Sequence, residues 1–164
     1  KIGENSEILL RGKTITKGYY KKTEATAAGI DAEGWFHTGD LATMSADGHF
    51  FVRGRSKNML LGPNGQNIYP EEIEDKLNSL AMVNESIVLQ SNDKLVALVH
   101  PDMEEVSNLG FTDEDLANIM EENRKELNLQ MPSFAHISRI QLHDTEFEKT
   151  AKKSIKRYLY QDVI

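Results

Sequence analysis

The sequence predicts an α+β fold: a β-rich segment followed by a small domain with helices on a short sheet. Residues 1–55 contain short aromatic and β-branched runs separated by glycines. Residues 56–164 instead read in the order helix, strand, strand, helix, strand, helix. This change of character near residue 55 predicts two domains, at 1–55 and 56–164.

Composition narrows the class of protein. Of the 164 residues, 39% are hydrophobic and 27% charged, which favours a packed core over disorder. A formal net charge of −7 disfavours nucleic-acid binding, which needs clustered positive charge. The chain has no cysteine, so disulfides, thiolate catalysis and cysteine–zinc sites are excluded. The sequence begins with Lys1 and not with an initiator methionine, and its first residues do not resemble a signal peptide, so we expect the natural protein to be longer.

The first segment is expected to be all β. A short apolar run occupies Glu7–Arg11, and aromatic strands are expected at Trp35–His37 and His49–Arg53. Between the last two lies Asp47-Gly48, a two-residue hairpin signal in which both central positions adopt positive φ.

The second segment begins with a helix from Pro70 to about Leu80, with Ile73, Leu77 and Leu80 on one face. Two strands then follow, joined by a turn at 91–93. These two strands are Ser86–Leu89 and Leu95–Val99. Further elements are a helix capped by Thr112 and ending near Leu129, a strand at Phe134–Leu142, and a basic helix at Ala151–Tyr160.

Two stretches of the first segment suggest nucleotide binding. In Trp35–Leu41, Gly39 allows close backbone approach, and the Asp40 carboxylate accepts hydrogen bonds from paired hydroxyls such as those of a ribose. Arg55 presents a guanidinium that forks onto hydroxyl or phosphate oxygens. The alternative for Gly39 and Asp40 is an ordinary turn between strands, and the alternative for Arg55 is a surface arginine at the end of a strand.

Two stretches of the second segment are also candidates. The glycine-bearing loop at 62–69 leads into a helix but lacks the Gly-Lys-Ser/Thr ending of a P-loop. In Lys149–Arg157, five of nine residues are cationic, which fits either a phosphate site or a solvated helix face. The histidines at 37, 49, 100, 136 and 143 show no metal-ligand spacing, so no metal site is predicted.

Taken in order, these stretches resemble the adenylate-forming superfamily of acyl-CoA synthetases, peptide-synthetase adenylation domains and luciferases. Glu7–Gly12 with Lys17–Tyr20 is similar to its Gly-Glu and Gly-Tyr segment, Trp35–Leu41 to its Thr-Gly-Asp motif, and Gly54–Lys57 to its hinge. Asn67–Glu74 is especially similar to long-chain fatty acid–CoA ligases. The resemblance covers essentially the whole chain.

The resemblance implies a two-step reaction. A fatty acid and ATP, with Mg2+, give an acyl-adenylate and pyrophosphate, and the CoA thiol then attacks after the C-terminal domain swings about its hinge. By position it assigns nucleotide binding to Thr38, Asp40 and Arg55, the hinge to Lys57, and CoA binding to Gly65 and Asn67. Residues 1–55 would end a large adenylation domain whose phosphate loop and acyl pocket lie upstream, so the isolated chain is expected to be inactive. A cytoplasmic enzyme with peripheral membrane contact and no membrane-spanning segment is expected.

One departure concerns the catalytic lysine. The family pattern is Pro-Lys-Thr-x-x-Gly-Lys-(apolar)-x-Arg, and alignment on Ile155–Arg157 puts Ser154 at its second lysine and Glu148 at its proline. Serine supplies no cation. We therefore expect the adjacent Lys153 to take the catalytic role, provided that the segment is a loop.

Two alternatives remain. A ligase that loads acyl groups onto a carrier protein would use the same chemistry. A non-catalytic binding or regulatory module that kept the fold would explain Ser154.

Overall fold

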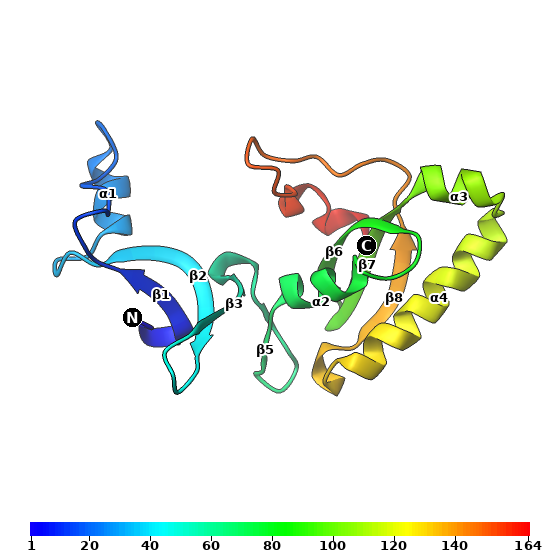
Figure 1. Ribbon diagram of the computed structural model, residues 1–164, viewed down its shortest axis with the longest axis horizontal. Coiled ribbons are helices and arrows are strands. Elements are labelled where there is room, and N and C mark those ends of the chain that lie inside the picture. Colours follow the sequence, from blue (N-terminus) through cyan, green and yellow to red (C-terminus); the bar gives the residue numbers. More distant parts are fainter. The chain divides into compact units, whose positions relative to one another are not determined.

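The computed structural model describes all residues 1–164, and the chain divides into two compact units, Lys1–Met59 and Leu60–Ile164. Helices and small sheets occur in both units, which confirms the predicted α+β class (Figure 1). None of the helices has the length and apolar character needed to cross a membrane.

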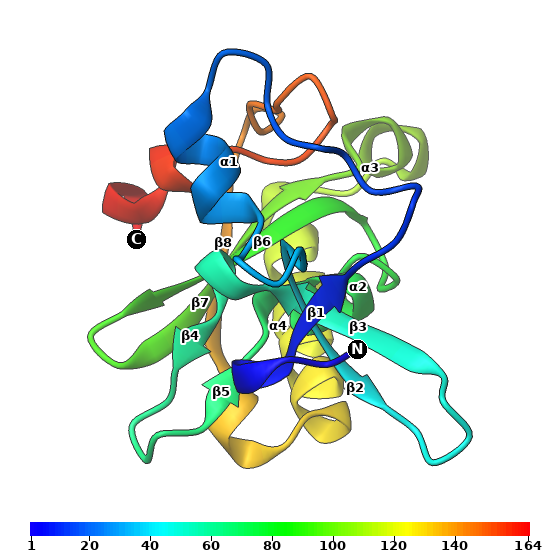
Figure 2. The ribbon, with the colours of Figure 1, turned by 90° about the vertical axis from the view of Figure 1, so that its left-hand side faces the viewer.

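The first unit is built on an antiparallel sheet in the order β1-β2-β3 (Figure 2). Its elements are a 3-10 turn at Glu4–Ser6, β1 (Glu7–Leu10), α1 (Thr23–Gly29), β2 (Phe36–Met44), β3 (Phe50–Arg55) and a 3-10 turn at Ser56–Asn58. Leu9, Leu41 and Ala42 form its small buried core. The register places Asp40 opposite Arg55 across β2 and β3, so the pairing of these strands also sets the geometry of two candidate site residues.

Two expectations for this unit are corrected. It is not all β, because α1 forms where three alanines, the best helix formers, follow Glu24 in the first turn. The β2–β3 hairpin exists, but of Asp47 and Gly48 only Gly48 has positive φ. Gly48 donates its N–H to the Ser45 carbonyl, and Ser45 donates its N–H to the His49 carbonyl. The loop between β2 and β3 is therefore longer than the predicted two-residue turn.

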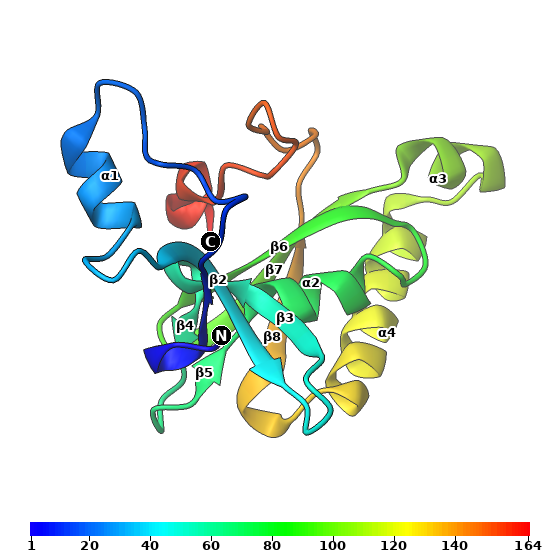
Figure 3. The ribbon, with the colours of Figure 1, turned by 60° about the vertical axis from the view of Figure 1, so that its left-hand side comes forward.

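The second unit has a sheet in the order β6-β7-β8, with β7 antiparallel to β6 and parallel to β8. Its elements are β4 (Leu60–Leu61), β5 (Asn67–Ile68), α2 (Pro70–Leu77), β6 (Val83–Ser91), β7 (Lys94–Pro101), α3 (Met103–Leu109), α4 (Asp113–Gln130), a 3-10 turn at Ser133–Ala135, β8 (Ile137–Leu142), and 3-10 turns at Arg157–Leu159 and Gln161–Val163. One face of the sheet packs on α2 and α4, and the C-terminal segment covers the other (Figure 3).

Side chains of β6 alternate between these two faces. Val88 packs with the helices, whereas Ile87 and Leu89 pack with Phe147 and Tyr160 of the C-terminal segment. Both faces of the sheet are therefore buried, which is why β7 is an almost continuous apolar run.

Several predicted elements of this unit are confirmed. Helix α2 begins at Pro70 and buries Ile73 and Leu77 completely, although it ends at Leu77 and not near Leu80 as predicted. Thr112 caps α4 in a capping box with Asp115. The turn between β6 and β7 consists of Asn92 and Asp93, both with positive φ, as a tight hairpin requires.

The predicted helix at Ala151–Tyr160 is wrong. Lys149 pairs with Ile155 in an antiparallel bridge, and Lys153 between them has a φ of +62°. On a helix, Ile155 and Tyr160 would point about 140° apart. The irregular path lets both side chains pack on the sheet, so tertiary burial overrides local propensity. Helix α3 was not predicted, although Asp102 and Gly110 cap its two ends.

Candidate functional site

The predicted nucleotide-binding residues lie together on β2 and β3 of the first unit. Arg55 donates from Nη1 to Asp40 Oδ1 at 2.5 Å, and both side chains are partly exposed. Thr38 donates its hydroxyl to the Ile8 carbonyl at 2.8 Å and accepts the Asp40 N–H at 3.1 Å. Asp40 is therefore held by its own backbone and by the guanidinium, with carboxylate oxygens accessible to a ligand.

Glu7 on β1 fixes the backbone of this motif. Its Oε1 accepts the Gly39 N–H at 2.8 Å, and its Oε2 lies 2.9 Å from His37 Nδ1. Gly39 has a φ of +70°, a conformation that glycine adopts without steric cost. One partly exposed carboxylate thus holds the residues on either side of Thr38.

His37 titrates within this network. The hydrogen bond that His37 donates to Glu7, together with the charges of Glu7 and Asp31, raises the pKa of His37 above its ordinary value. His37 Nε2 lies 3.6 Å from Asp31 Oδ2, so the imidazole sits between two carboxylates. The hydrogen bond from the Trp35 N–H lowers the pKa of Asp31, which keeps this acid ionised beside the histidine.

We expect the stability of the first unit to fall as the pH rises above about 6.5, the ordinary pKa of a histidine. Because the folded-state pKa is raised, the stabilisation is complete below the unfolded pKa of about 6.5 and is lost as pH passes the folded value. Trp35, the single tryptophan, reports on this unit, so its fluorescence in urea titrations measures the effect. His37→Gln should flatten the pH dependence, whereas His136→Gln in the other unit should not; an unchanged slope in His37→Gln would contradict the assignment.

Lys57, the predicted hinge residue, lies in the 3-10 turn Ser56–Asn58 directly after β3. Its side chain is exposed. The division between the two units falls two residues later, after Met59. Lys57 is therefore placed at the connection between the units.

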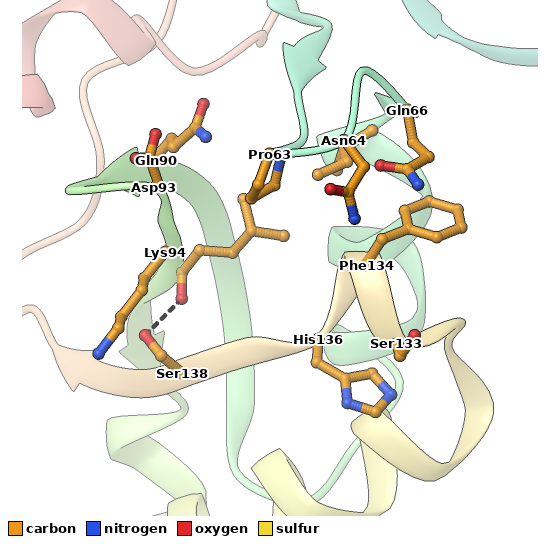
Figure 4. A pocket seen from close by; sticks show the side chains of 12 residues that line it. Pro63, Asn64, Gln66, Gln90, Asp93, Lys94, Ser133, Phe134, His136 and Ser138 are labelled. Atoms are coloured by element: carbon orange, nitrogen blue, oxygen red, sulfur yellow. Dashed lines mark hydrogen bonds between the residues drawn. The ribbon is translucent and has the colours of Figure 1, made fainter.

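The predicted CoA-binding residues belong to the β4–β5 hairpin of the second unit. Gly65 has a φ of +79° and donates its N–H to the Gly62 carbonyl at 2.9 Å, which closes the turn. Asn67 begins β5 and is exposed. The loop borders a hollow of about 360 Å3 whose lining includes Asn64, Gln66 and Phe134 (Figure 4).

The opposite part of this hollow comes from the β6–β7 turn and β8. Lys94 and Ser138 lie here, and Ser138 donates its hydroxyl to the Leu95 carbonyl at 2.7 Å (Figure 4). Gln66 Oε1 is buried and has no hydrogen-bond partner.

Lys153 lies at the tip of a short hairpin formed by residues 149–156, called here the lysine hairpin. Thr150 donates its N–H to the Ser154 carbonyl at 2.8 Å, and Lys153 donates its N–H to the Thr150 carbonyl at 2.9 Å. The side chains of Lys149 and Lys156 pair with Glu85 and Glu148 at 2.6 and 2.9 Å. Lys152 and Lys153 are exposed and belong to none of these pairs.

The structure does not bring all the predicted residues together. Thr38, Asp40 and Arg55 form one cluster in the first unit. Within the second unit, the β4–β5 loop and the lysine hairpin lie at opposite ends in all three ribbon views. No three His, Cys, Asp or Glu side chains converge as a metal cage anywhere in the chain.

Comparison with protein families gives one match over most of the second unit. The model of the AMP-binding enzyme C-terminal domain matches residues 57–162. A relative in Mycobacterium tuberculosis, 3-[(3aS,4S,7aS)-7a-methyl-1,5-dioxo-octahydro-1H-inden-4-yl]propanoyl:CoA ligase, is 36% identical over 72% of this chain and 25% of its own length. A long-chain-fatty-acid–CoA ligase of Mus musculus is 33% identical over 57% of this chain and 13% of its own. The chain thus spans a quarter or less of these two relatives.

Among solved structures, the adenylation domain of a carboxylate reductase from Mycobacterium chelonae superposes with a TM-score of 0.84. The match covers 96% of this chain and 26% of that domain at 19% identity. At that identity the similarity is one of fold.

Proposed function

Since this chain belongs to the AMP-binding enzyme C-terminal domain family, we propose that it is the C-terminal part of an adenylate-forming fatty acid–CoA ligase. In this proposal the whole enzyme joins a fatty acid to ATP, releases pyrophosphate and transfers the acyl group to CoA. Residues 1–55 end its large adenylation domain, and 56–164 form the domain that swings about Lys57. The isolated chain is inactive because the acyl pocket lies outside it.

The observation that carries the proposal is the Asp40–Arg55 pair beside Gly39. Two carboxylate oxygens on a fixed backbone suit the two hydroxyls of a ribose, and the guanidinium adds a positive charge for the nucleotide. In this proposal Mg2+ enters bound to the ATP phosphates, the usual mode for this ion at nucleotide sites.

The second unit supplies the residues for the two steps. Lys153 provides the cation for adenylation, and the β4–β5 loop with Gly65 and Asn67 approaches the CoA arm. The polar hollow beside that loop supports the second assignment. The relative named a long-chain-fatty-acid–CoA ligase, and the similarity of residues 67–74 to that group, support a long-chain substrate.

Pyrophosphate release by the full-length enzyme tests the function. The assay supplies ATP, Mg2+ and carboxylic acids that range from short to long aliphatic chains and include aromatic acids, with and without CoA. Release that depends on a long-chain acid, followed by thioester formation, is expected. A well-folded enzyme that releases none with any acid would favour a non-catalytic module, and Ser154 is the feature that favours this alternative.

Asp40→Asn in the full-length enzyme should weaken ATP binding by about 10- to 100-fold. Hydrogen bonds to a charged group contribute roughly 1.5–3 kcal/mol, and the amide is a weaker acceptor with one oxygen fewer. Titration calorimetry with ATP measures the loss. Asp47→Asn, on the exposed β2–β3 loop, is the matched control; equal losses in both variants would exclude a direct role for Asp40.

A further inference from the structure

A buried ion pair joins the start and the end of the second unit. Glu74 on α2 is 6% exposed, and Arg157 immediately after the lysine hairpin has a side chain that is 17% exposed. The guanidinium binds both carboxylate oxygens, with Nη1 2.6 Å from Oε1 and Nη2 in contact with Oε2. This bidentate geometry fixes the orientation as well as the distance of the two groups.

The same carboxylate also binds the sheet. Glu74 Oε1 accepts the Val88 N–H at 2.5 Å, and Arg157 Nη1 donates to the Val88 carbonyl at 3.3 Å. Burial raises the pKa of the Glu74 carboxyl, and the paired guanidinium opposes that rise. Helix α2, strand β6 and the end of the lysine hairpin are thus joined at one buried point.

A second acid holds the other end of the lysine hairpin. Glu85 on β6 accepts the Phe147 N–H at 3.0 Å and pairs with Lys149 at 2.6 Å. Its side chain is 12% exposed. Between these two anchors the hairpin is closed by its own backbone bonds, and only the tip with Lys152 and Lys153 extends away from them.

We propose that the Glu74–Arg157 pair is a positioning element that holds the lysine hairpin on α2 and β6 and so sets where Lys153 is presented during adenylation. The inference rests on the proposed function, because Lys153 acts there only in the adenylation step. A small displacement of a charged group from its working position lowers a rate by up to about 100-fold.

Amide hydrogen exchange on the 164-residue chain tests the mechanical part. Arg157→Gln removes the guanidinium, and peptides covering residues 148–157 should exchange at least about tenfold faster as local opening becomes easier. Arg124→Gln is the matched control, because Arg124 forms an equally bidentate pair with Glu121 on the exposed side of α4. The control should leave residues 148–157 unchanged.

Kinetics of the full-length enzyme test the catalytic part. Arg157→Gln should lower kcat for acyl-adenylate formation by about 10- to 100-fold with little change in KM for ATP. Thioester formation from supplied acyl-adenylate should change less than about threefold, whereas general unfolding would impair both steps. Arg157→Lys keeps the positive charge but cannot form the bidentate pair, so its adenylation rate should lie between those of the wild type and Arg157→Gln.

The outcomes separate the inference from the proposed function. Unchanged exchange in Arg157→Gln, or normal adenylation despite faster exchange, would overturn the positioning role. Equal losses in both half-reactions would also overturn it, in favour of a purely structural pair. If the wild-type enzyme adenylates no carboxylic acid, the proposed function fails, and the exchange result alone decides whether the pair holds the hairpin.

Discussion

Lys153→Ala in the full-length enzyme is expected to slow acyl-adenylate formation by about 100- to 1000-fold. This is the usual loss when one preorganised donor that stabilises transition-state charge is removed. Ser154 supplies no cation, and Lys149 and Lys156 already pair with Glu85 and Glu148. Exchange of labelled pyrophosphate into ATP measures the step, and thioester formation from supplied acyl-adenylate should be preserved.

The neighbouring residues provide matched variants for this prediction. Lys152→Ala removes an exposed cation from the same tip and should cost little. Lys153→Gly combined with Ser154→Lys introduces the Gly-Lys pair of the family pattern at these two positions. Because a φ of +62° at position 153 suits glycine, this double variant should regain much of the adenylation rate that Lys153→Ala loses. A larger loss in Lys152→Ala than in Lys153→Ala would show that the other tip lysine is the catalytic cation.

Elements with strong local signals were predictable. Thr112 with its acidic first turn marked the start of α4, Pro70 marked that of α2, and Asn92 and Asp93 formed the expected tight turn. In each case neighbouring residues decide the backbone conformation. The caps of α3 were also readable, but a helix of seven residues offers too little periodicity to recognise.

The C-terminal segment was not predictable in the same way. Its lysines suit a helix surface, but its path depends on Glu85 and Glu74, which lie far away along the chain. Its apolar residues pack on the sheet face opposite α2 and α4. These contacts cannot be predicted from the neighbouring sequence, because each residue's partner is brought to it only by the tertiary fold.

The candidate site shows the same division. Asp40 and Arg55 stood out by residue type, and the register of β2 and β3 brings them together. Glu7 and Glu74 lie in stretches that carry the family resemblance, but their positioning roles were not predicted, since a glutamate looks the same in a sequence whether it is solvated or buried. The role of Glu7 is recognised only from its contact with Gly39, 32 residues later, and that of Glu74 only from its contact with Arg157, 83 residues later.

Phe147→Ala should destabilise the second unit by about 3–5 kcal/mol, the usual cost of removing a buried phenyl ring from a packed core. Phe147 is 3% exposed and belongs to the cluster that covers the outer face of the sheet. Its ring stacks on His143 at 5.0 Å between centroids and meets the edge of Tyr160 at 5.0 Å. The C-terminal segment is therefore expected to be part of the core of this unit.

Circular dichroism at 222 nm follows this unfolding, because α2, α3 and α4 all lie in the second unit, while Trp35 fluorescence follows the first. Phe134→Ala is the control of the same residue type, since Phe134 is 40% exposed, and it should cost about 1 kcal/mol or less. Equal losses in the two variants would mean that the segment after β8 adds little to the core. The lysine hairpin would then depend on its ion pairs alone, and Arg157→Gln would leave it held by the Glu85 anchor only.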